Sequence, residues 1–596
     1  MMRRLVIAAL VAAALVVAGA AGAVALFRAY PVRMSLFAAM TRNYLRSLSA
    51  PKGATTTELN PAYKGAAPPS PSSAAASGAD EDWPSYNRTL TSERYAPVAE
   101  INASTVGKLK VLCTYDTKQY TSFESGLIMV EGALIGTTIA DIFSIDPATC
   151  AENWRTHEDF PPSILSAMRG VAYLDGMLFR GTQDGRVLAY DFKTGKRIWQ
   201  TTIVDAHRSE FVPGAPIAWN GLVFIGNAGG DAKGGKGHMF ALDAKTGKIV
   251  WEFFLVPKTE GDMVRGPQGA SPLDTSTWIN APGIPISGGA SWTSTTLDPA
   301  TGELYVPVGN PGPAYVIGVR EGDNLFTGSI VVLDAKTGAY KRHFKLVHRD
   351  WHDWDVASAP SVIETAGGKK LLATAPKDGY LYGVDLAENT VIYRAPVTKM
   401  ENADVPFSVD ASVRFCPGAT GGSEWNGPAY DPQTNLILTG ETEWCTTVKL
   451  QTNQQLRDVP TGGLWMGMAT RNPFRILGQQ EGSWGGWVYA VDADSGVWKW
   501  RLRSNYPVVG GVTPTAGGLV FFGDVGGNFY AVDAATGEKL WGRKIGGAIG
   551  GGVIAYKAGG GEKIAVTTGL TGPTWPTESV TGKIAVLGLD DAPAKQ

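Results

Sequence analysis

The chain of 596 residues carries almost no net charge and has few residues of the kinds that bind haem or zinc. Its 53 Lys and Arg nearly balance 55 Asp and Glu, and no basic block occurs, so nucleic-acid binding has no electrostatic basis. No Cys-x-x-Cys-His stretch is present, so the chain carries no c-type haem of its own. Only six His occur, and without a His-Glu-x-x-His stretch His348 and His352 do not predict a zinc site.

A long uncharged apolar run is present at the N-terminus, at residues 5–27, with arginines on both sides. At 1.5 Å per residue, a helix over this run spans a bilayer core of about 30 Å. We predict that residues 1–33 form a retained membrane anchor. The alternative is a cleaved signal peptide, because the small residues at 18–25 offer a cleavage site. Either interpretation places the rest of the chain outside the cytoplasm, in the periplasm.

Residues 34–82 are predicted to be a juxtamembrane segment and linker. From 51 to 82 the sequence is rich in Pro, Ala, Ser and Gly, and it has too few apolar residues to fold by burying them. Residues 83–596 are then predicted to form the folded domain.

Cysteine is scarce, since the chain has only four. An even number in an oxidising compartment allows two disulfides. The simplest pairing joins neighbours in the sequence, Cys113 with Cys150 and Cys416 with Cys445.

Glycine is abundant, at 74 residues, which indicates many tight turns and argues against a helical bundle. One pattern recurs: a strand, an Asp, a turn with Thr-Gly, and a strand that often ends in Trp. Its Asp residues are spaced by 45 from Asp146 to Asp191, 52 to Asp243, and 41 from Asp492 to Asp533. Such spacing is typical of four-stranded propeller blades. Further copies occur at Asp334 and Asp385, and Trp residues close the copies at Trp154, Trp199, Trp251, Trp500 and Trp541.

The repeat predicts an all-β, eight-bladed β-propeller with tryptophan-type blades. In each turn the Asp accepts local hydrogen bonds and the Gly takes a positive φ, and each Trp wedges between neighbouring blades. Imperfect copies at Asp298 and Asp431 are interpreted as inner hairpins. Residues 108–116 and 582–589 are expected to pair and close the ring, which removes exposed strand edges.

Several stretches interrupt the blades with Gly, Trp and oxygen-bearing side chains. They are RGVAY with Arg169, GNAGGDAKGGKG with Asp231, GGASW with Trp292, VGNPGPA with Asn310, VHRDWHDWDVASAP with Asp353 and Asp355, APKDGYLY with Lys377, and GGSEWNGPAYDP with Trp425 and Asn426. In this order, over residues 82–589, they resemble the alcohol dehydrogenases that depend on pyrroloquinoline quinone (PQQ), whose catalytic domain is an eight-bladed propeller.

The resemblance implies a hard cation held by Asp231, Asn310 and Asp353. Oxygen ligands suit Ca²⁺. Asp355 completes a D-x-D arrangement that the family associates with lanthanide-dependent members, although calcium- or magnesium-using enzymes also carry it. Asp231 is one methylene shorter than the family's usual glutamate, so the choice between Ca²⁺ and a lanthanide stays open.

The resemblance also implies catalytic and cofactor-binding roles. Asp353 takes the alcohol proton as a general base, and Lys377 hydrogen-bonds a reactive quinone oxygen. Trp292 forms the floor on which the flat cofactor stacks. Further cofactor contacts are expected from the side chains of Glu124, Arg169, Trp425 and Asn426.

Two departures from the family weaken the expected grip on the cofactor. Ser163 and Ile164 stand where many members have adjacent cysteines, so no vicinal disulfide covers the cofactor. Pro213 stands where a threonine is common, which removes one hydrogen bond.

The function expected from the resemblance is periplasmic oxidation of an alcohol to an aldehyde or ketone by hydride transfer to PQQ. Without its own haem, the chain must pass electrons to an external cytochrome c or a membrane quinone. Two alternatives stay open: a non-catalytic propeller scaffold at the membrane, and a sugar or polyol dehydrogenase of the same fold.

Overall fold

A computed structural model describes residues 55–65, 81–160, 167–267, 275–469, 485–572, 574–575 and 577–589, with scattered positions between 19 and 45. Most of the predicted anchor, together with Ser163 and Ile164, lies outside the described residues. Among the residues described, no helix combines the length and apolar character needed to cross a membrane.

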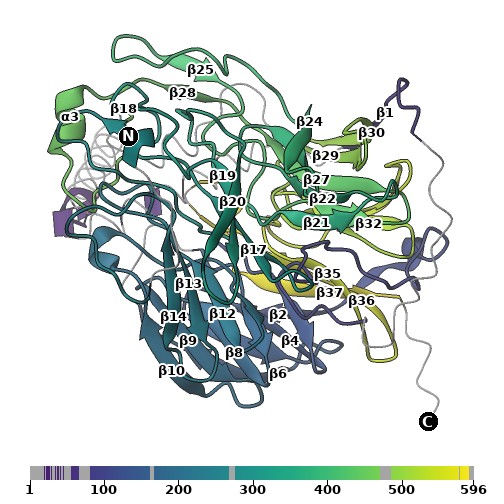
Figure 1. Cartoon of the computed structure of the whole chain (residues 1–596). Helices are drawn as coiled ribbons and strands as arrows, with labels where there is room; N and C mark the ends of the chain where they lie inside the picture. The colour runs from purple at the N-terminus through teal and green to yellow at the C-terminus, as the bar shows by residue number, and fades with distance from the viewer. Residues whose placement is uncertain are drawn as a thin grey trace, which may run out of the picture.

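The described chain forms an eight-bladed propeller of four-stranded antiparallel sheets, which confirms the predicted fold (Figure 1). First strands of neighbouring blades contact each other around the centre, as β7 does with β11 and β26 with β31. The first four blades are β3 (Ile128–Val130), β4 (Ala133–Thr137), β5 (Asp141–Ile145) and β6 (Glu152–His157); β7 (Ala172–Leu174), β8 (Met177–Gly181), β9 (Arg186–Asp191) and β10 (Arg197–Thr202); β11 (Ile217–Trp219), β12 (Leu222–Gly226), β13 (His238–Asp243) and β14 (Ile249–Phe254); and β16 (Thr296–Asp298), β17 (Glu303–Val308), β19 (Ser329–Asp334) and β20 (Tyr340–Lys345).

The next four blades include the one that closes the ring. They are β21 (Ser361–Glu364), β22 (Lys370–Thr374), β23 (Tyr380–Asp385) and β24 (Thr390–Pro396); β26 (Ala429–Asp431), β27 (Leu436–Glu443), β29 (Gly485–Asp492) and β30 (Trp498–Ser504); β31 (Thr513–Pro514), β32 (Leu519–Gly523), β33 (Asn528–Asp533) and β34 (Lys539–Lys544); and β35 (Val553–Ala558), β36 (Gly561–Thr568), β37 (Lys583–Gly588) and β2 (Lys110–Asp116).

Short elements lie in the connections outside the eight blades. Two small two-stranded sheets pair β15 with β18 and β25 with β28. These elements and the helices are β15 (Ile279–Asn280), β18 (Arg320–Glu321), β25 (Val413–Phe415), β28 (Thr446–Val448), α3 (Asn453–Asp458), and the 3-10 turns η2 (Val106–Lys108), η3 (Ala206–Arg208) and η4 (Thr275–Thr277).

The two ends of the domain close the ring in one blade. β2 pairs antiparallel with β37, from Lys110 opposite Gly588 to Asp116 opposite Lys583, as expected for residues 108–116 and 582–589. Figure 1 shows β2 beside the yellow strands of the C-terminal end. Because this pair joins the two ends of the domain in one sheet, the ring closes without leaving the edge of β37 unpaired.

The repeat motif links neighbouring blades at four junctions. Asp191 Oδ1 accepts hydrogen bonds from the backbone N–H and hydroxyl of Thr194. Gly195 has φ +67°, and a Cβ there would lie 2.3 Å from the ring of Trp154 in the previous blade, so the turn needs glycine on both grounds. The Trp154 indole N–H donates to the carbonyl of Phe192 at 3.0 Å. The same bond recurs from Trp199 to Ala244, from Trp251 to Ala335 and from Trp500 to Ala534.

The two imperfect copies lie in inner hairpins, as interpreted. Asp298 ends β16 and Asp431 ends β26, the first strands of their blades, and each strand forms a hairpin with the strand that follows. Their carboxylates still accept turn hydrogen bonds, from Ala300 N and Gln433 N respectively.

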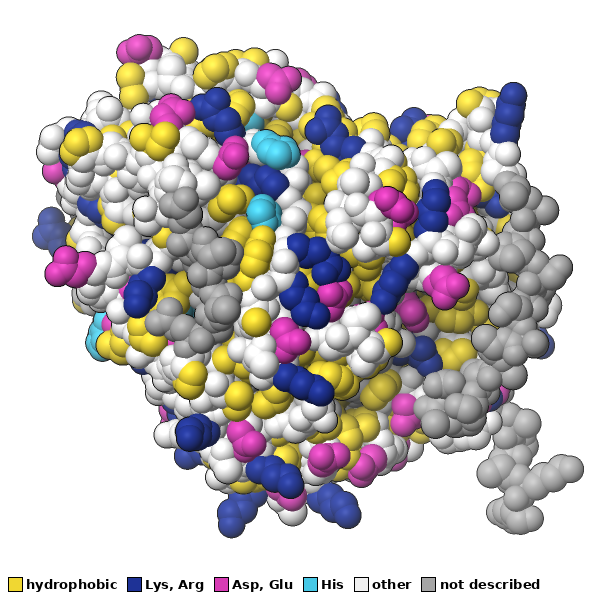
Figure 2. Space-filling view, in the orientation of Figure 1, with side chains coloured by type: hydrophobic (Ala, Val, Ile, Leu, Met, Phe, Trp, Pro, Cys, Tyr) yellow, Lys and Arg dark blue, Asp and Glu magenta, His cyan; other side chains and the backbone are white. Residues whose placement is uncertain are grey.

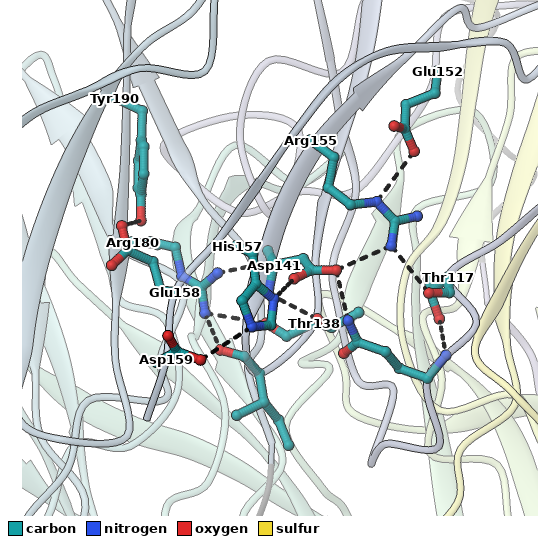
Figure 3. A network of polar contacts seen from close by, with 12 residues as sticks. Thr117, Thr138, Asp141, Glu152, Arg155, His157, Glu158, Asp159, Arg180 and Tyr190 are labelled. Carbon is teal, nitrogen blue, oxygen red and sulfur yellow. Dashed lines mark hydrogen bonds and ion pairs between the residues drawn. The ribbon is translucent and has the colours of Figure 1, made fainter. Parts of the chain in front are cut away.

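A buried arginine provides a further tie between the first two blades. Arg180, on β8, is fully buried and donates to the backbone carbonyls of Asp141, Thr138 and Ile139 in the preceding blade. Figure 3 shows this network, in which the Asp141 side chain also accepts from Arg155 at 3.0 Å. Satisfying three carbonyls at once is what makes burial of the guanidinium tolerable.

Both predicted disulfides are confirmed. Cys113 on β2 is bonded to Cys150 in the turn before β6, which links the closing blade to the first one. Cys416, after β25, is bonded to Cys445, before β28.

Part of the predicted linker belongs to the propeller. Thr55–Leu59 forms β1, which pairs antiparallel with β30 from Thr55 opposite Ser504 to Leu59 opposite Trp500 (Figure 1). The linker prediction considered only apolar burial, but an added edge strand is held by main-chain hydrogen bonds. Glu58 adds an ion pair with Arg501 at 2.6 Å, and Thr57 Oγ1 donates to the carbonyl of Gly537.

Candidate active site

The loops that carry the predicted site residues leave the blades at one face. Asp231, Asn310 and Lys377 each lie between the second and third strands of a blade, whereas Trp292 and Asp353 lie between one blade's fourth strand and the next blade's first strand. In an antiparallel blade these two connections are at the same end. The fold therefore brings residues from three successive blades to one end of the central channel.

Two of these loops are held together through a shared glycine segment. Gly288 N donates to the carbonyl of Gly235, in the Asp231 loop, and Gly289 N donates to the carbonyl of Asn310, both at 2.9 Å. A Cβ at Gly288 would lie 2.4 Å from the Asn310 carbonyl oxygen, and its φ is +107°. Only glycine permits this approach, so the GGASW stretch determines how close Asp231 and Asn310 lie.

Asp231, Asn310 and Asp353 converge. The Asp231 carboxyl is hydrogen-bonded to the Asn310 side chain, and its pKa is raised to about 6 by burial and by the charge of Asp355. Burial, followed by the charges of Asp231 and Asp355, raises the pKa of Asp353 well above its ordinary value. One oxygen of each aspartate, Asp231 Oδ1 and Asp353 Oδ1, is buried without a hydrogen-bond partner. Unpartnered buried carboxylate oxygens beside an amide are the ligand set expected for a hard cation.

Asp353 sits on a sharply turned backbone. Its φ is +69°, in the left-handed region that non-glycine residues rarely adopt. The Asp350 carboxylate holds this turn by accepting from the backbone N–H groups of His352 at 2.9 Å and Trp354 at 3.1 Å. Backbone strain of this kind clusters at functional sites, where the surrounding structure compensates for it.

Asp355 differs from the other two aspartates because both of its oxygens have partners. Oδ1 accepts from the backbone N–H of Asn310 at 2.8 Å, and Oδ2 lies 2.8 Å from Lys377 Nζ. Lys377 Nζ also lies 3.8 Å from Asp353 Oδ2. Burial alone lowers the pKa of this ammonium, but the charges of Asp355 and Asp353 raise it well above its ordinary value. Lys377 therefore stays protonated next to the proposed base.

Trp292 is flanked by two cations. Arg169 Cζ lies 4.6 Å and Lys377 Nζ lies 5.4 Å from the centroid of its ring. Arg169 forms a buried ion pair with Glu124 at 2.6 Å, and its backbone N–H donates to the Pro213 carbonyl at 2.9 Å. An aromatic plane with positive groups over its ring fits a flat anionic ligand.

Trp425 and Asn426 lie near the ring of Trp292, but their polar atoms form hydrogen bonds within the protein. The Trp425 indole N–H donates to the Gly550 carbonyl at 2.7 Å, and its ring lies 5.1 Å from Arg169 Cζ. Asn426 Nδ2 donates to the Val509 carbonyl, and its Oδ1 accepts from the Tyr86 hydroxyl. Asn426 therefore links segments far apart in the chain, whereas Trp425 offers its ring.

Sequence reasoning missed two buried side chains at the site, Glu424 and Tyr315. The Tyr315 hydroxyl is buried without a hydrogen-bond partner, and the charges of Asp353 and Asp231 contribute to a raised pKa, after burial. Glu424 directly precedes Trp425, so an acid next to a predicted cofactor contact was the available signal. His348 is exposed whereas His352 is buried against Trp354, so these two histidines form no joint site.

Comparison with known proteins shows the family of the chain. Residues 83–408, more than half of the chain, match the sequence profile of the PQQ glucose/ethanol/alcohol dehydrogenase β-propeller domain. The chain belongs to the PQQ-dependent alcohol dehydrogenase family. A curated family relative, "Alcohol dehydrogenase (quinone), dehydrogenase subunit" from Komagataeibacter europaeus, is 30% identical over 82% of this chain and 72% of its own length. "Quinohemoprotein alcohol dehydrogenase ADH-IIG" from Pseudomonas putida is 29% identical over 82% of this chain and 73% of its own.

Solved structures of an alcohol dehydrogenase and a methanol dehydrogenase share the fold. The quinohemoprotein alcohol dehydrogenase ADHIIG from Pseudomonas putida superposes with a TM-score of 0.75 and 25% identity, covering 87% of this chain and 82% of that one. A europium-containing methanol dehydrogenase has a TM-score of 0.74 at 23% identity, covering 86% and 98%, which shows the fold alone. The protein is therefore a PQQ-dependent oxidoreductase that acts on an alcohol.

Proposed function

We propose that the protein is a periplasmic dehydrogenase that oxidises an alcohol to an aldehyde or ketone, with Asp353 as the general base. The observation that carries the proposal is the buried, unpartnered oxygen of Asp353, held next to Asp231 on a left-handed turn. A base must present a free lone pair to the substrate hydroxyl.

Asp231, Asn310 and Asp353 are the proposed cation ligands, and their oxygen chemistry suits Ca²⁺ or a lanthanide. Asp355 is proposed as a fourth ligand. Because Lys377 and the Asn310 N–H already hold both of its oxygens, it also fixes the position of the lysine. PQQ held at Trp292 and Lys377 would supply the hydride acceptor, and a cation held by Asp231, Asn310 and Asp353 would supply Lewis-acid polarisation of the quinone.

The chain's own residues supply positioning and proton transfer. Trp292 provides the stacking surface, and Arg169, with Glu124, faces the anionic edge of the ligand. Asp353 receives the hydroxyl proton of the alcohol, while the ammonium of Lys377, 3.8 Å from it, stabilises negative charge that develops nearby. Trp425 adds a second ring on the side of Arg169.

Residues 1–33 are proposed to export the domain and to tether it to the inner membrane. We propose that electrons pass to an external cytochrome c or a membrane quinone. One observation favours the alternative of a non-catalytic scaffold. Residues 485–572 match the profile of the outer membrane protein assembly factor BamB. That stretch contains none of the proposed cation ligands, so it reflects blade repeats.

Reconstitution tests the proposal directly. Purified protein mixed with PQQ and either Ca²⁺ or La³⁺ is expected to reduce an artificial dye when an alcohol is added. A panel of primary alcohols, secondary alcohols and sugars separates an alcohol dehydrogenase from a polyol dehydrogenase. No dye reduction with any substrate or ion would leave the scaffold alternative.

Changing Asp355 tests its role as the fourth ligand. Asp355→Ala is expected to remove the lanthanide-supported activity selectively, because a trivalent ion needs the additional negative charge. Equal activity with both ions in this variant would restrict Asp355 to holding Lys377.

A further inference from the structure

Glu424 is a buried acid without a role in the proposed reaction. Its side chain is 7% exposed, and it makes no hydrogen bond or ion pair with any residue that the structure describes. The charged groups that face it are Lys377, Glu124, Arg169 and Asp355, and burial, with the two nearby acids, raises its pKa to about 8 despite the two cations. An ionised carboxylate without a partner is costly at this depth.

The backbone places Glu424 near the ring of Trp292, on which the cofactor is proposed to stack. Gly422 N donates to the Lys377 carbonyl at 2.8 Å, and a Cβ at Gly421 would lie 2.4 Å from the Lys377 side chain. The next residue, Trp425, packs against Arg169. Glu424 is thus carried on a loop that runs from Lys377 to Arg169, the two cations that flank the ring of Trp292.

Neither cation is free to neutralise Glu424. Arg169 is paired with Glu124 at 2.6 Å, and Lys377 is paired with Asp355 at 2.8 Å. With Asp231 and Asp353 added, the carboxyl groups at the site outnumber the cations. PQQ itself carries carboxylates, so a further negative charge beside it would repel the ligand.

We infer that Glu424 is a cofactor-binding residue that donates a hydrogen bond to PQQ from its own protonated carboxyl group, and that PQQ is held less tightly once this carboxyl ionises. The inference rests on the proposed function and adds a residue that the family resemblance did not supply. A neutral acid offers one O–H donor, whereas its ionised form offers none and adds charge.

The test is PQQ affinity, measured by quenching of tryptophan fluorescence in protein saturated with Ca²⁺. Titrations run from pH 7, which is above the pKa of about 6 of Asp231, to pH 9.5. The wild type is compared with Glu424→Gln, a neutral donor of the same shape, and with Glu424→Met, which has no donor. Glu562→Gln is the matched control, because Glu562 is also buried with a raised pKa but lies in the β35–β36 hairpin of the closing blade.

Between pH 7 and 9.5, Kd of the wild type and of Glu562→Gln is expected to rise about tenfold, since the donor is lost and a charge is added. Kd of Glu424→Gln should stay within about twofold over the same range, and Kd of Glu424→Met should be about tenfold higher than that of the wild type at pH 7.

Two results would overturn the inference: the same pH dependence in Glu424→Gln as in the wild type, or wild-type affinity in Glu424→Met at pH 7. If the wild type bound no PQQ at any pH, the proposed function itself would fail. Thermal melts of each variant show that the protein is folded.

Discussion

Aspartates occur in the turns of the blades, called here the wall, and at the central channel, called here the centre. The two environments shift the pKa of aspartate in opposite directions. In the wall, Asp191 and Asp243 accept hydrogen bonds from Thr194 and Thr246, which lower their pKa. At the centre, burial raises the pKa of Asp231 and Asp353. On the face of the molecule shown in Figure 2, acidic and basic side chains are mixed over the solvent-exposed surface.

The wall aspartates are satisfied by their own turns, so their charge stabilises the fold. The central aspartates keep unpartnered oxygens, so their charge destabilises the fold until something binds. The hydrogen-bonded turn aspartates Asp191 and Asp243 therefore have a structural role, whereas Asp231 and Asp353 keep oxygens free for a ligand.

Replacing Asp353 by Asn should have the largest effect on activity. The amide has the same shape but does not accept the substrate proton, so we expect turnover to fall by about 10²–10⁴-fold. Dye-linked oxidation measures the loss, and a thermal melt should show an intact fold. Turnover close to that of the wild type would mean that another residue is the base.

Removing a wall tryptophan should affect stability instead. Trp251→Ala deletes a fully buried ring and its bond to Ala335, and we expect a loss of about 3–5 kcal/mol in the free energy of unfolding. Trp541→Ala is the matched control, because Trp541 ends the same motif but is only half-buried. Equal losses in chemical denaturation would contradict the role assigned to the tie between blades.

The blades and their ties could be predicted because each repeat specifies its own turn. The closing pair between β2 and β37 was predicted from the two terminal stretches of the domain, and the disulfides from the even number of cysteines and the pairing of sequence neighbours. The strand β1 was missed, because Thr55–Leu59 contains little to bury and pairs through its backbone.

The site was predicted only as a set of residues. Its partners arise where loops distant in sequence meet. The bond from Asn310 N to Asp355 and the bond from Tyr86 to Asn426 join segments that no local pattern relates. The burial of Glu424 is likewise a product of the loop that crosses Lys377.

Metal-dependent stabilisation should depend on pH. A buried carboxyl whose pKa rises on folding stabilises the metal-free protein at low pH, and this stability is lost as pH rises from 3.8 towards about 6 for Asp231. Above that range the ionised site binds a cation, which at 100 times Kd stabilises by about 2.7 kcal/mol. We expect Ca²⁺ to raise Tm more at pH 7.5 than at pH 5, because protons compete at the lower pH. Equal shifts would argue against Asp231 as a ligand.

A wall aspartate should give the smallest effect. Asp191→Ala removes exposed turn hydrogen bonds from Thr194, and we expect a loss of about 1 kcal/mol in stability with unchanged turnover. A fall in turnover beyond that explained by unfolding would contradict the separation of wall from centre.

The most direct measurement is the metal and PQQ content of the reconstituted protein after removal of free ligand. The wild type should retain one cation and one PQQ per chain, and Asp231→Ala and Asp353→Ala should each lose the cation while Asp191→Ala keeps it. A wild-type protein that retains neither ligand, or central variants that retain the cation as well as the wild type does, would contradict a cation site formed by Asp231, Asn310 and Asp353.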